Sequence, residues 1–526
     1  MRGARIDSML FAALAVQVAG CCATGTSAAC SGDSDLDGDG WTVEQGDCDD
    51  QDSSIFPGAP ELSNDGMDSN CDGVDAVAES LSLYGAAIQP APGMAEFGTA
   101  LDAAPIPDTG GREFELLASA PALWPPEPVR PQVLWTRVDA QTRVATELGR
   151  LEHTREASQF GLGLALGDLD GDGELDAAIG APGDSSPSYG YQGGSIFVVD
   201  GPPSAQSSLS TAAVEQQGLW GPEDVWFVGH HLSIDRGSAA APEARLLVGA
   251  PSPTNTGSGR PGSLFVVNGP VPRPSELQDV GARVDGGSNN DRFGDALAVS
   301  GDGDGDGAGD LLVGAMLDSD LVPRGGAVYL YDGTPTDPDV AAVFRGSSEL
   351  EQLGYSVAFA GDVNGDGIED VMFGAPLHSS SAERAGRAYV FFGPVAGSYL
   401  SEDADVTIDG GSAHGFLGAS LVSVGDIDQD GFDEIAIGRP GDPYFGTTSG
   451  AVLVFSVDSP GLLTPSDADR VLSGAQPLDL AGWALAANRC ANGGPEGCAP
   501  VLAVGAPGHQ GAAGRSGLVY LVDLAR

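Results

Sequence analysis

Short apolar runs, separated by polar and glycine-rich turns, recur along the chain from about residue 80 to the C-terminus. One set of runs is rich in β-branched and aromatic residues and is apolar at successive positions, which is typical of a strand buried on both faces. These predicted strands are residues 195–199, 263–267, 327–331, 388–392, 451–455 and 518–522. The pattern therefore predicts an all-β fold.

A second pattern repeats in register with these strands. It begins with Phe-Gly or Leu-Gly, passes through an acidic loop and ends in a variant of Gly-Ala-Pro. Four clear copies span 160–182, 293–316, 353–376 and 417–440, and three degenerate ones keep only the ending at 118–121, 248–251 and 504–507. The seven endings lie roughly 60 to 70 residues apart, a period that indicates a repeat architecture and not separate domains.

Sixty-odd residues suit a blade of four antiparallel strands with their turns, and radial packing of blades leaves only short exposed edges. The repeats therefore predict a seven-bladed β-propeller over residues 80–526. Only four residues follow the last predicted strand, 518–522, so the seventh blade lacks an outermost strand. We expect residues 80–85 to supply it by pairing with 518–522, which would join the two ends of the ring.

Composition supports the propeller interpretation and excludes two classes of binding partner. The 526 residues include 79 glycines and 36 prolines, while aromatic residues make up 6%, which favours many turns between short strands. Acidic residues outnumber basic ones by 75 to 23, giving a net charge of −52. This charge argues against nucleic acid or an anionic membrane surface as a partner.

Much of the acidity is concentrated in loops with the spacing of a cation site. In one repeat, oxygen-bearing side chains occupy loop positions 1, 3, 5 and 9, and Gly367 at position 6 allows a tight bend. These side chains belong to Asp362, Asn364, Asp366 and Asp370. Two carboxylates about 4 Å apart repel by roughly 4 kcal/mol near a protein surface, so the loop is expected to need a cation such as Ca²⁺.

The series of Phe-Gly, D-x-D-x-D-G-x-x-D and Gly-Ala-Pro motifs resembles the FG-GAP repeats of the seven-bladed propeller in integrin α-subunits. The resemblance covers residues 80–526, with four well-kept motifs and three degraded ones. In that family the cation loop joins the first two strands of a blade. Carried over residue by residue, it implies metal ligands at Asp168, Asp170, Asp172 and Asp176; Asp302, Asp304, Asp306 and Asp310; Asp362, Asn364, Asp366 and Asp370; and Asp426, Asp428, Asp430 and Glu434.

The same resemblance implies a backbone carbonyl ligand at loop position 7, from Glu174, Ala308, Ile368 and Phe432. Glu434 replaces the usual aspartate with a longer side chain in the same role. Ala308 and Gly309 make the second loop more flexible than the others, which predicts a weaker site there. About four Ca²⁺ ions are therefore expected in the propeller.

An acidic, cysteine-containing segment at 33–75 precedes the propeller. Asp33, Asp35, Asp37 and Asp39, with Glu44 at position 12, match an EF-hand loop, although flanking helices are absent. The continuation resembles a metal-binding motif of bacterial surface proteins and the thrombospondin type 3 repeats. A segment this short cannot bury enough apolar area to fold alone, so one or more Ca²⁺ ions and disulfides are expected to hold it together.

The first 20 residues are typical of an export signal. Arg2 and Arg5 precede a short apolar run, and the segment ends at Cys21 in a sequence that resembles the lipobox of bacterial lipoproteins. This resemblance implies acylation of Cys21, a flexible tether over 21–32 and anchoring at the bacterial outer membrane or cell surface. An ordinary secretory signal cleaved nearby is the alternative.

Seven cysteines suit an oxidising compartment outside the cytoplasm. With Cys21 acylated, six remain. Cys48 and Cys71 lie within the acidic module, whereas Cys490 and Cys498 lie in the loop where the seventh repeat lacks its cation motif. Both pairs are predicted disulfides, and the second would replace a cation as the crosslink of that hairpin.

The sequence carries no motif of a hydrolase: it has no G-x-S-x-G and no H-E-x-x-H, and its six histidines are scattered. We therefore expect a non-enzymatic, lipid-anchored binding or adhesion module that recognises an extracellular protein or glycan. Two alternatives stay open. One is a hydrolase or lyase with its site in the central channel, which a cluster of histidine, aspartate and arginine at the channel mouth would favour; the other is a passive surface scaffold.

Overall fold

A computed structural model of the chain describes residues 79–524, except 82–85, 91–93, 107–108, 110–111, 122–129, 154, 156–157, 185–192, 204–206, 210–217, 223–226, 236–243, 252–259, 334–339, 380, 444–447, 489–499 and 512–513. The described residues belong to one compact unit. The predicted signal, tether, acidic module with its ligands, Cys21 and both cysteine pairs lie outside them.

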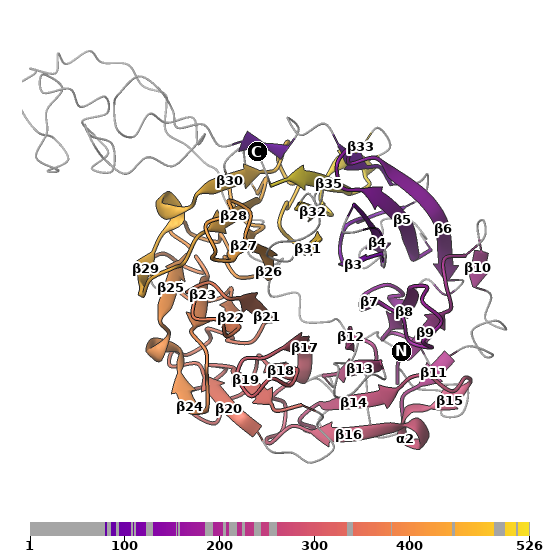
Figure 1. The fold of residues 1–526 in the computed structure, drawn as a ribbon, viewed down its shortest axis with the longest axis horizontal. Helices are drawn as coiled ribbons and strands as arrows, with labels where there is room; N and C mark the ends of the chain where they lie inside the picture. Colours follow the sequence, from indigo (N-terminus) through magenta and orange to yellow (C-terminus); the bar gives the residue numbers. More distant parts are fainter. Residues whose placement is uncertain are drawn as a thin grey trace, which may run out of the picture. The chain divides into compact units, whose positions relative to one another are not determined.

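The unit is a seven-bladed β-propeller, as predicted (Figure 1). Each blade is one sheet whose first four strands are antiparallel, and blades are numbered along the chain by their first strands. These innermost strands are β3 (Leu101–Pro105), β7 (Leu164–Gly167), β12 (His231–Asp235), β17 (Phe293–Gly301), β21 (Ser356–Gly361), β26 (Ser420–Gly425) and β31 (Leu485–Asn488). Each contacts the first strand of the next blade, and β31 contacts β3, so the ring is closed.

The remaining three strands of each blade follow outward. The second strands are β4 (Glu113–Ala120), β8 (Asp176–Ala181), β13 (Arg245–Ala250), β18 (Asp310–Ala315), β22 (Asp370–Ala375), β27 (Glu434–Arg439) and β32 (Val501–Ala506). The third strands are β5 (Gln132–Asp139), β9 (Ser195–Val199), β14 (Ser263–Asn268), β19 (Ala327–Tyr331), β23 (Arg387–Phe391), β28 (Ala451–Phe455) and β35 (Leu518–Asp523). The fourth strands are β6 (Ala145–His153), β11 (Gly218–Trp220), β16 (Gly281–Asp285), β20 (Val340–Arg345), β25 (Val406–Asp409), β30 (Arg470–Ser473) and β2 (Ala87–Ile88).

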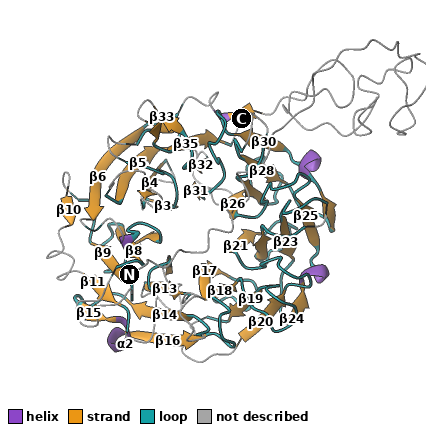
Figure 2. Cartoon of the chain, turned by 180° about the vertical axis from the view of Figure 1, so that it is seen from behind, coloured by secondary structure: helices purple, strands orange, loops and turns teal. Residues whose placement is uncertain are grey.

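The six apolar runs predicted from the sequence are the third strands of blades two to seven, within one residue at either end. Every residue of β28 is buried, as are the first four of β9. Neighbouring sheets bury both faces of a blade, which explains why these strands are apolar at successive positions. The short helix α2 (Leu277–Val280) lies on the outside of the ring (Figure 2).

Five blades carry a fifth, parallel strand that the sequence did not predict. Four of these strands come from the connection between the third and fourth strands of the next blade, and the fifth comes from the N-terminal end of the unit. They are β10 (Ser207–Leu209) on β6, β15 (Ser275–Glu276) on β11, β24 (Gly397–Leu400) on β20, β29 (Gly461–Leu463) on β25 and β1 (Glu79–Ser80) on β30. In these five blades, the outer edge of the sheet is thereby covered by a strand from another part of the chain.

The N-terminal segment does join the ends of the ring, but the predicted residues were wrong. The strand that pairs with β35 is β2, with Ala87 opposite Tyr520 and Ile88 opposite Val519. Ser80 lies instead in β1, which pairs with β30 of blade six. The reason is that this segment contributes to two sheets. β1 pairs with the fourth strand of blade six, in the position that a strand of the neighbouring blade occupies elsewhere, and β2 is the fourth strand of blade seven.

Contacts between backbones explain the Phe-Gly and Gly-Ala-Pro motifs. The glycine of Gly-Ala-Pro in one blade faces the carbonyl of the Phe-Gly or Leu-Gly glycine in the next, so that a Cβ added to Gly374 would lie 2.0 Å from the Gly418 oxygen. Gly418 itself has φ +85, a conformation that favours glycine. The same contact between Gly505 and Gly98 closes the ring, since a Cβ at Gly505 would lie 2.1 Å from the Gly98 oxygen.

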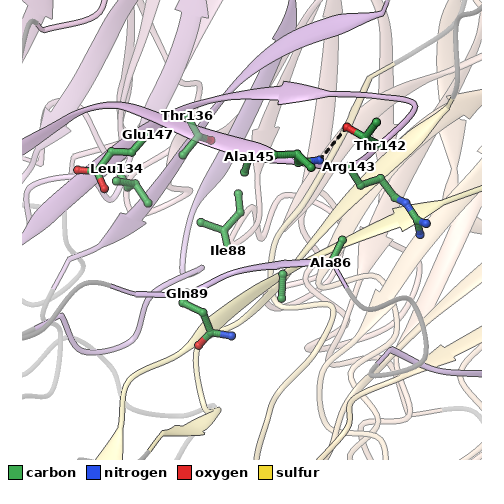
Figure 3. Close-up of a pocket in the computed structure, with 11 residues that line it drawn as sticks. Ala86, Ile88, Gln89, Leu134, Thr136, Thr142, Arg143, Ala145 and Glu147 are labelled. Carbon is green, nitrogen blue, oxygen red and sulfur yellow. Dashed lines mark hydrogen bonds between the residues drawn. The ribbon is translucent and has the colours of Figure 1, made fainter.

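Side chains from blades seven and one form one apolar cluster at this closure. It includes Ile88, Phe97, Leu134, Val519 and Leu521. Ile88 points from β2 towards the β5–β6 hairpin, beside a cavity of about 430 Å³ (Figure 3). The charged residues lining that cavity are Arg143 and Glu147, and no cation loop borders it. The cavity therefore belongs to the ring closure.

Candidate metal centres

The four predicted cation loops join the first and second strands of blades two, four, five and six. In each loop, position 1 directly follows the last residue of the first strand. Position 9 is the first residue of the second strand: Asp176, Asp310, Asp370 and Glu434. Each position-9 residue is therefore the first residue of a strand that packs in the core of its blade. This placement agrees with the arrangement that the family resemblance implied.

Hydrogen bonds within each loop turn its carboxylates inward. In blade five, the Asp366 and Gly367 N–H groups donate to the two oxygens of Asp362, at 3.0 and 2.9 Å, and Ile368 N–H donates to Asp366 Oδ1 at 2.9 Å. Asp168, Asp302 and Asp426 accept equivalent bonds in the other blades. The glycine at position 6 has φ between +88 and +100 in all four loops, which explains why the motif needs glycine there.

The position-9 carboxylates are buried, with 0 to 2% of each residue exposed. Each accepts a hydrogen bond from the N–H at position 2, such as Val363 to Asp370 Oδ2 at 2.9 Å and Ile427 to Glu434 Oε2 at 2.8 Å. Burial raises the pKa of Asp176 to about 6 and that of Asp310, Asp370 and Glu434 to about 7, and neighbouring carboxylates act in the same direction. A buried anion among other anions is costly unless a cation pairs with it.

The donor set suits a hard divalent cation. In blade two, one oxygen each of Asp168, Asp170 and Asp176 lie within 4.8 Å of one another, and Asp426, Asp428 and Glu434 form the equivalent group in blade six. Blade five has Asn364 at position 3, so its group contains one acid fewer. In blade four, Asp310 Oδ2 accepts the N–H groups of Gly303 and Asp304, at 2.9 and 3.2 Å. Oxygen donors without sulfur or imidazole favour Ca²⁺ or Mg²⁺ over transition metals.

Two acidic residues at loop position 8, which sequence reasoning missed, connect successive loops. Glu369 Oε2 of blade five accepts the N–H of Asp302 in blade four at 2.9 Å, and Asp433 Oδ2 of blade six accepts the N–H of Asp362 in blade five at 3.1 Å. Asp433 N–H also donates to the Asp362 carbonyl at 3.0 Å. The position-1 ligand of one loop is thus held by the next loop. An acid directly before position 9 is the only sequence signal of this contact.

Replacing Glu369 by alanine is expected to weaken cation binding at the blade-four loop. The Asp302 N–H would lose a charged acceptor, and a hydrogen bond of that kind contributes about 1.5–3 kcal/mol when it is fully formed. Partial replacement by water leaves about 1 kcal/mol, or roughly a five-fold loss of affinity. Calorimetric titration of the full chain with Ca²⁺ measures this change. Glu402→Gln, at an exposed carboxylate away from the loops, is the control and should leave all affinities unchanged.

The raised pKa values predict how stability depends on pH without cations. The folded state holds protons on Asp176, Asp310, Asp370 and Glu434 more tightly than the unfolded chain, whose carboxyl groups titrate near 4. The stabilisation is complete below about pH 4 and is lost as the pH rises through 6 to 7. In EDTA, the melting temperature should therefore fall between pH 5 and pH 8. A rise over this range would contradict the prediction.

A separate polar cluster lies beside the innermost strands of blades three and four. Asp295 Oδ1 lies 3.4 Å from His230 Nδ1 and 2.7 Å from Arg292 Nη2. Burial lowers the pKa of His230, and Asp295 partly opposes this effect. His230 precedes β12 and Asp295 lies at the start of β17, so both occupy the strand ends remote from the cation loops. The sequence did not bring these residues together, because they are 65 positions apart in different repeats.

Comparison with known families agrees with the fold and with the loop motif. The family model described as "FG-GAP repeat" matches residues 160–199, 353–391 and 418–455, in blades two, five and six. The model described as "Putative metal-binding motif" matches residues 47–76. The chain therefore carries a seven-bladed propeller in which three blades match the FG-GAP repeat, preceded in sequence by a match to a metal-binding motif.

Among curated proteins, the chain is similar to integrin α-subunits. It is 34% identical to integrin alpha-5 of Xenopus laevis over 191 residues, which is 35% of this chain and 16% of the relative. It is 33% identical to integrin alpha-8 of Gallus gallus over 162 residues, or 29% of this chain and 15% of the relative. The matched part thus spans about a sixth of the length of these relatives.

A solved structure, the acylaminoacyl peptidase of Pyrococcus horikoshii, aligns over 79% of this chain and 50% of its own, with 10% identity and a TM-score of 0.32. A likeness of this size carries no conclusion on activity. In the part of the chain that the structure describes, no helix is long and apolar enough to cross a membrane.

Proposed function

We propose that the protein is an exported, lipid-anchored and calcium-stabilised binding or adhesion module for an extracellular protein or glycan. The observation that carries the proposal is a closed FG-GAP propeller with acidic cation loops in four blades. Similarity to integrin α-subunits supports a surface-binding module. The lipid on Cys21 and the choice of Ca²⁺ rest on the sequence and on the oxygen-rich loops.

In this proposal, one end of the blades binds cations and the opposite end contacts the partner. The cation loops follow the first strands, whereas the connections between the second and third strands leave from the other end. These connections are long in several blades; in blade four, for example, residues 316–326 lie between β18 and β19. Cations would stiffen one face of the ring, and the loops of the opposite face would be presented to a partner.

Binding to defined partners tests this proposal. The full chain, immobilised through its C-terminus, is exposed to a panel of purified extracellular-matrix proteins and to a glycan array, in 2 mM Ca²⁺ and again in EDTA. We expect saturable binding to one class of partner that is lost in EDTA. Absence of saturable binding in Ca²⁺ to every member of both panels would instead favour a passive surface scaffold.

The lipid anchor has its own test. In a bacterial host that processes lipoproteins, the chain should incorporate labelled palmitate and partition with membranes, and Cys21→Ser should abolish both. Cys22→Ser is the matched control, because it changes the adjacent cysteine and leaves the acylation site intact. Absence of label in the unchanged protein would show that the segment is an ordinary secretory signal, and labelling of the Cys21→Ser protein would show that the lipid is attached elsewhere.

One observation favours the second candidate, a hydrolase or lyase. The contact of His230, Asp295 and Arg292 is the kind of cluster that this alternative requires, and a neutral histidine oriented by a carboxylate can act as a general base. A panel of chromogenic ester, glycoside and phosphodiester substrates tests it. Turnover that disappears in His230→Gln but persists in His414→Gln would establish this activity, whereas equal turnover in both would remove it.

A further inference from the structure

The outer edge of blade seven is not covered by any strand among the described residues. In four other blades, the fifth strand comes from the connection between the third and fourth strands of the next blade. For blade seven that connection is the β5–β6 hairpin, which consists of residues 140–144 alone. Five residues span at most about 17 Å when fully extended, so they cannot form a strand along β2 and also return to β6. The edge of β2 therefore has no covering strand from the hairpin.

Where a covering segment is present, one of its side chains fills the space between two blades. The ring centroid of Tyr399, in β24, lies 5.0 Å from that of Phe344 in blade four and 5.7 Å from that of Phe391 in blade five. Leu277 directly follows β15 and is 0% exposed in the cluster shared by blades two and three. Leu81 directly follows β1 and is 1% exposed in the cluster shared by blades six and seven. These contacts remove apolar surface of both blades from water.

At the corresponding junction of blades seven and one there is a cavity of about 430 Å³ (Figure 3). Its walls are residues 86–89, in and beside β2, and the β5–β6 hairpin. Ile88 and Leu134 contribute apolar atoms to these walls. The volume lies within the range of roughly 300–1,000 Å³ that ligand pockets occupy. The cavity thus lies next to the uncovered edge, where other junctions hold an apolar side chain of a covering segment.

The backbone of β2 is available for a further strand. The Ala86 carbonyl accepts the Leu521 N–H at 3.0 Å, so it faces β35. Because the backbone groups of successive strand residues point to opposite edges, the N–H and C=O of Ala87 face away from β35. The opposite wall is preformed, since the Asp139 side chain accepts the N–H and the hydroxyl of Thr142 at 2.7 and 2.8 Å in the hairpin turn.

The five covering segments share a sequence feature that indicates what would fit this edge. A leucine is the last residue of three of these strands and directly follows the other two: Leu81, Leu209, Leu277, Leu400 and Leu463. Serine or glycine stands two positions before the leucine in four of them. An acid follows it by two to four positions in three of them: Asp279, Asp403 and Asp467. Arg143 is the basic residue that lines the cavity, and its charge is complementary to such an acid.

We propose that the outer edge of blade seven binds an extended segment of a partner protein in which serine or glycine, any residue and leucine follow one another, with an acid shortly after. The segment adds a fifth strand parallel to β2, as all five covering strands are parallel to theirs. Its leucine enters the cavity beside Ile88. In strand addition, main-chain hydrogen bonds provide affinity and side-chain pockets provide specificity. This site goes beyond the adhesion proposal, because it uses the outermost strand of a blade and not the loops.

A synthetic peptide tests the proposal. The probe is a labelled copy of residues 274–281, and the control peptide has aspartate in place of the leucine that corresponds to Leu277. With the full chain in 1 mM Ca²⁺, fluorescence anisotropy should show saturable binding of the probe. The control should bind at least about ten-fold more weakly, because it lacks the apolar side chain. Hydrogen exchange measured by mass spectrometry should slow at residues 86–90 and 140–147 when the probe is bound.

Ala87→Pro is the matched variant of the protein. Proline removes the outward N–H of Ala87 and leaves the pairing of Ala86 and Ile88 with β35, so the probe should bind at least about ten-fold more weakly. An unchanged melting temperature verifies that this variant folds; if the temperature falls, the exchange pattern of the unchanged protein decides.

Three results would overturn the proposal. They are the absence of saturable binding, equal binding of the two peptides, and slowed exchange at β11, which would show that the probe displaces β15. A dimer that the probe dissociates in sedimentation would assign the edge to a second copy of this chain and not to another protein. None of these measurements involves the adhesion partner, so failure of the adhesion proposal leaves this inference unaffected.

Discussion

Removal of divalent cations is expected to lower the melting temperature of the protein by about 6 °C. Extracellular calcium sites commonly bind at 10⁻⁴–10⁻³ M, and at 1 mM Ca²⁺ the tighter end of that range stabilises by about 1.4 kcal/mol per site. Four sites add roughly 6 kcal/mol. With an unfolding entropy of about 2.1 cal/mol/K per residue, a propeller of this size converts that free energy into a shift of about 6 °C.

The measurement is a calorimetric or circular-dichroism melt in 1 mM Ca²⁺ and in EDTA. A single-site variant makes it sharper: Asp362→Ala should lose about a quarter of the shift, because it removes the position-1 ligand of blade five alone. Glu402→Gln, an exposed carboxylate outside the loops, should keep the whole shift. If EDTA leaves the melting temperature of the unchanged protein where it was, the loops are not structural cation sites.

Truncation of Ile88 to alanine is expected to lower the free energy of unfolding by about 2–4 kcal/mol. Ile88 is 6% exposed and packs in the cluster shared by blades seven and one. The strand that holds it, β2, pairs with β35 through only two residues, so the apolar contact contributes much of what keeps the ring closed. The loss is measured by urea denaturation in Ca²⁺.

Val144 provides the matched control for this truncation. It lies beside the same cavity, yet 59% of it is exposed, so Val144→Ala should change the free energy of unfolding by less than about 0.5 kcal/mol. Equal, small effects of the two substitutions would show that β2 is not needed for closure. A loss confined to Ile88→Ala supports the assignment of residues 87–88, and not 80–85, as the closing strand.

The repeat could be recognised from the sequence because its features are local. The spacing of Phe-Gly, the acidic loop and Gly-Ala-Pro is set by one blade, and most third strands are apolar over several successive positions. Gly374 and Gly418 show why the motif is so regular: each blade needs the same close backbone contact with the next. Six blades repeat this glycine contact, and blade one has Ser119 at the corresponding position. The repetition leaves a period that is visible in the sequence.

The closing strand and the fifth strands could not be predicted in the same way. A pairing of two residues, such as Glu79 and Ser80 with Leu472 and Ser473, leaves no alternation to detect. Its partner lies almost 400 positions away. Short pairings of this kind depend on which edges the finished blades leave open, and that is decided only when the ring has formed.

The sequence by itself determined the all-β class, the seven-fold repeat and the candidate oxygen ligands of four loops, because each follows from residues that are neighbours in the chain. The tertiary structure alone decided that Glu369 and Asp433 hold the loops of adjacent blades. These contacts join separate blades or separate strands. Electrostatic interaction depends on distance in space, and the folded ring sets that distance.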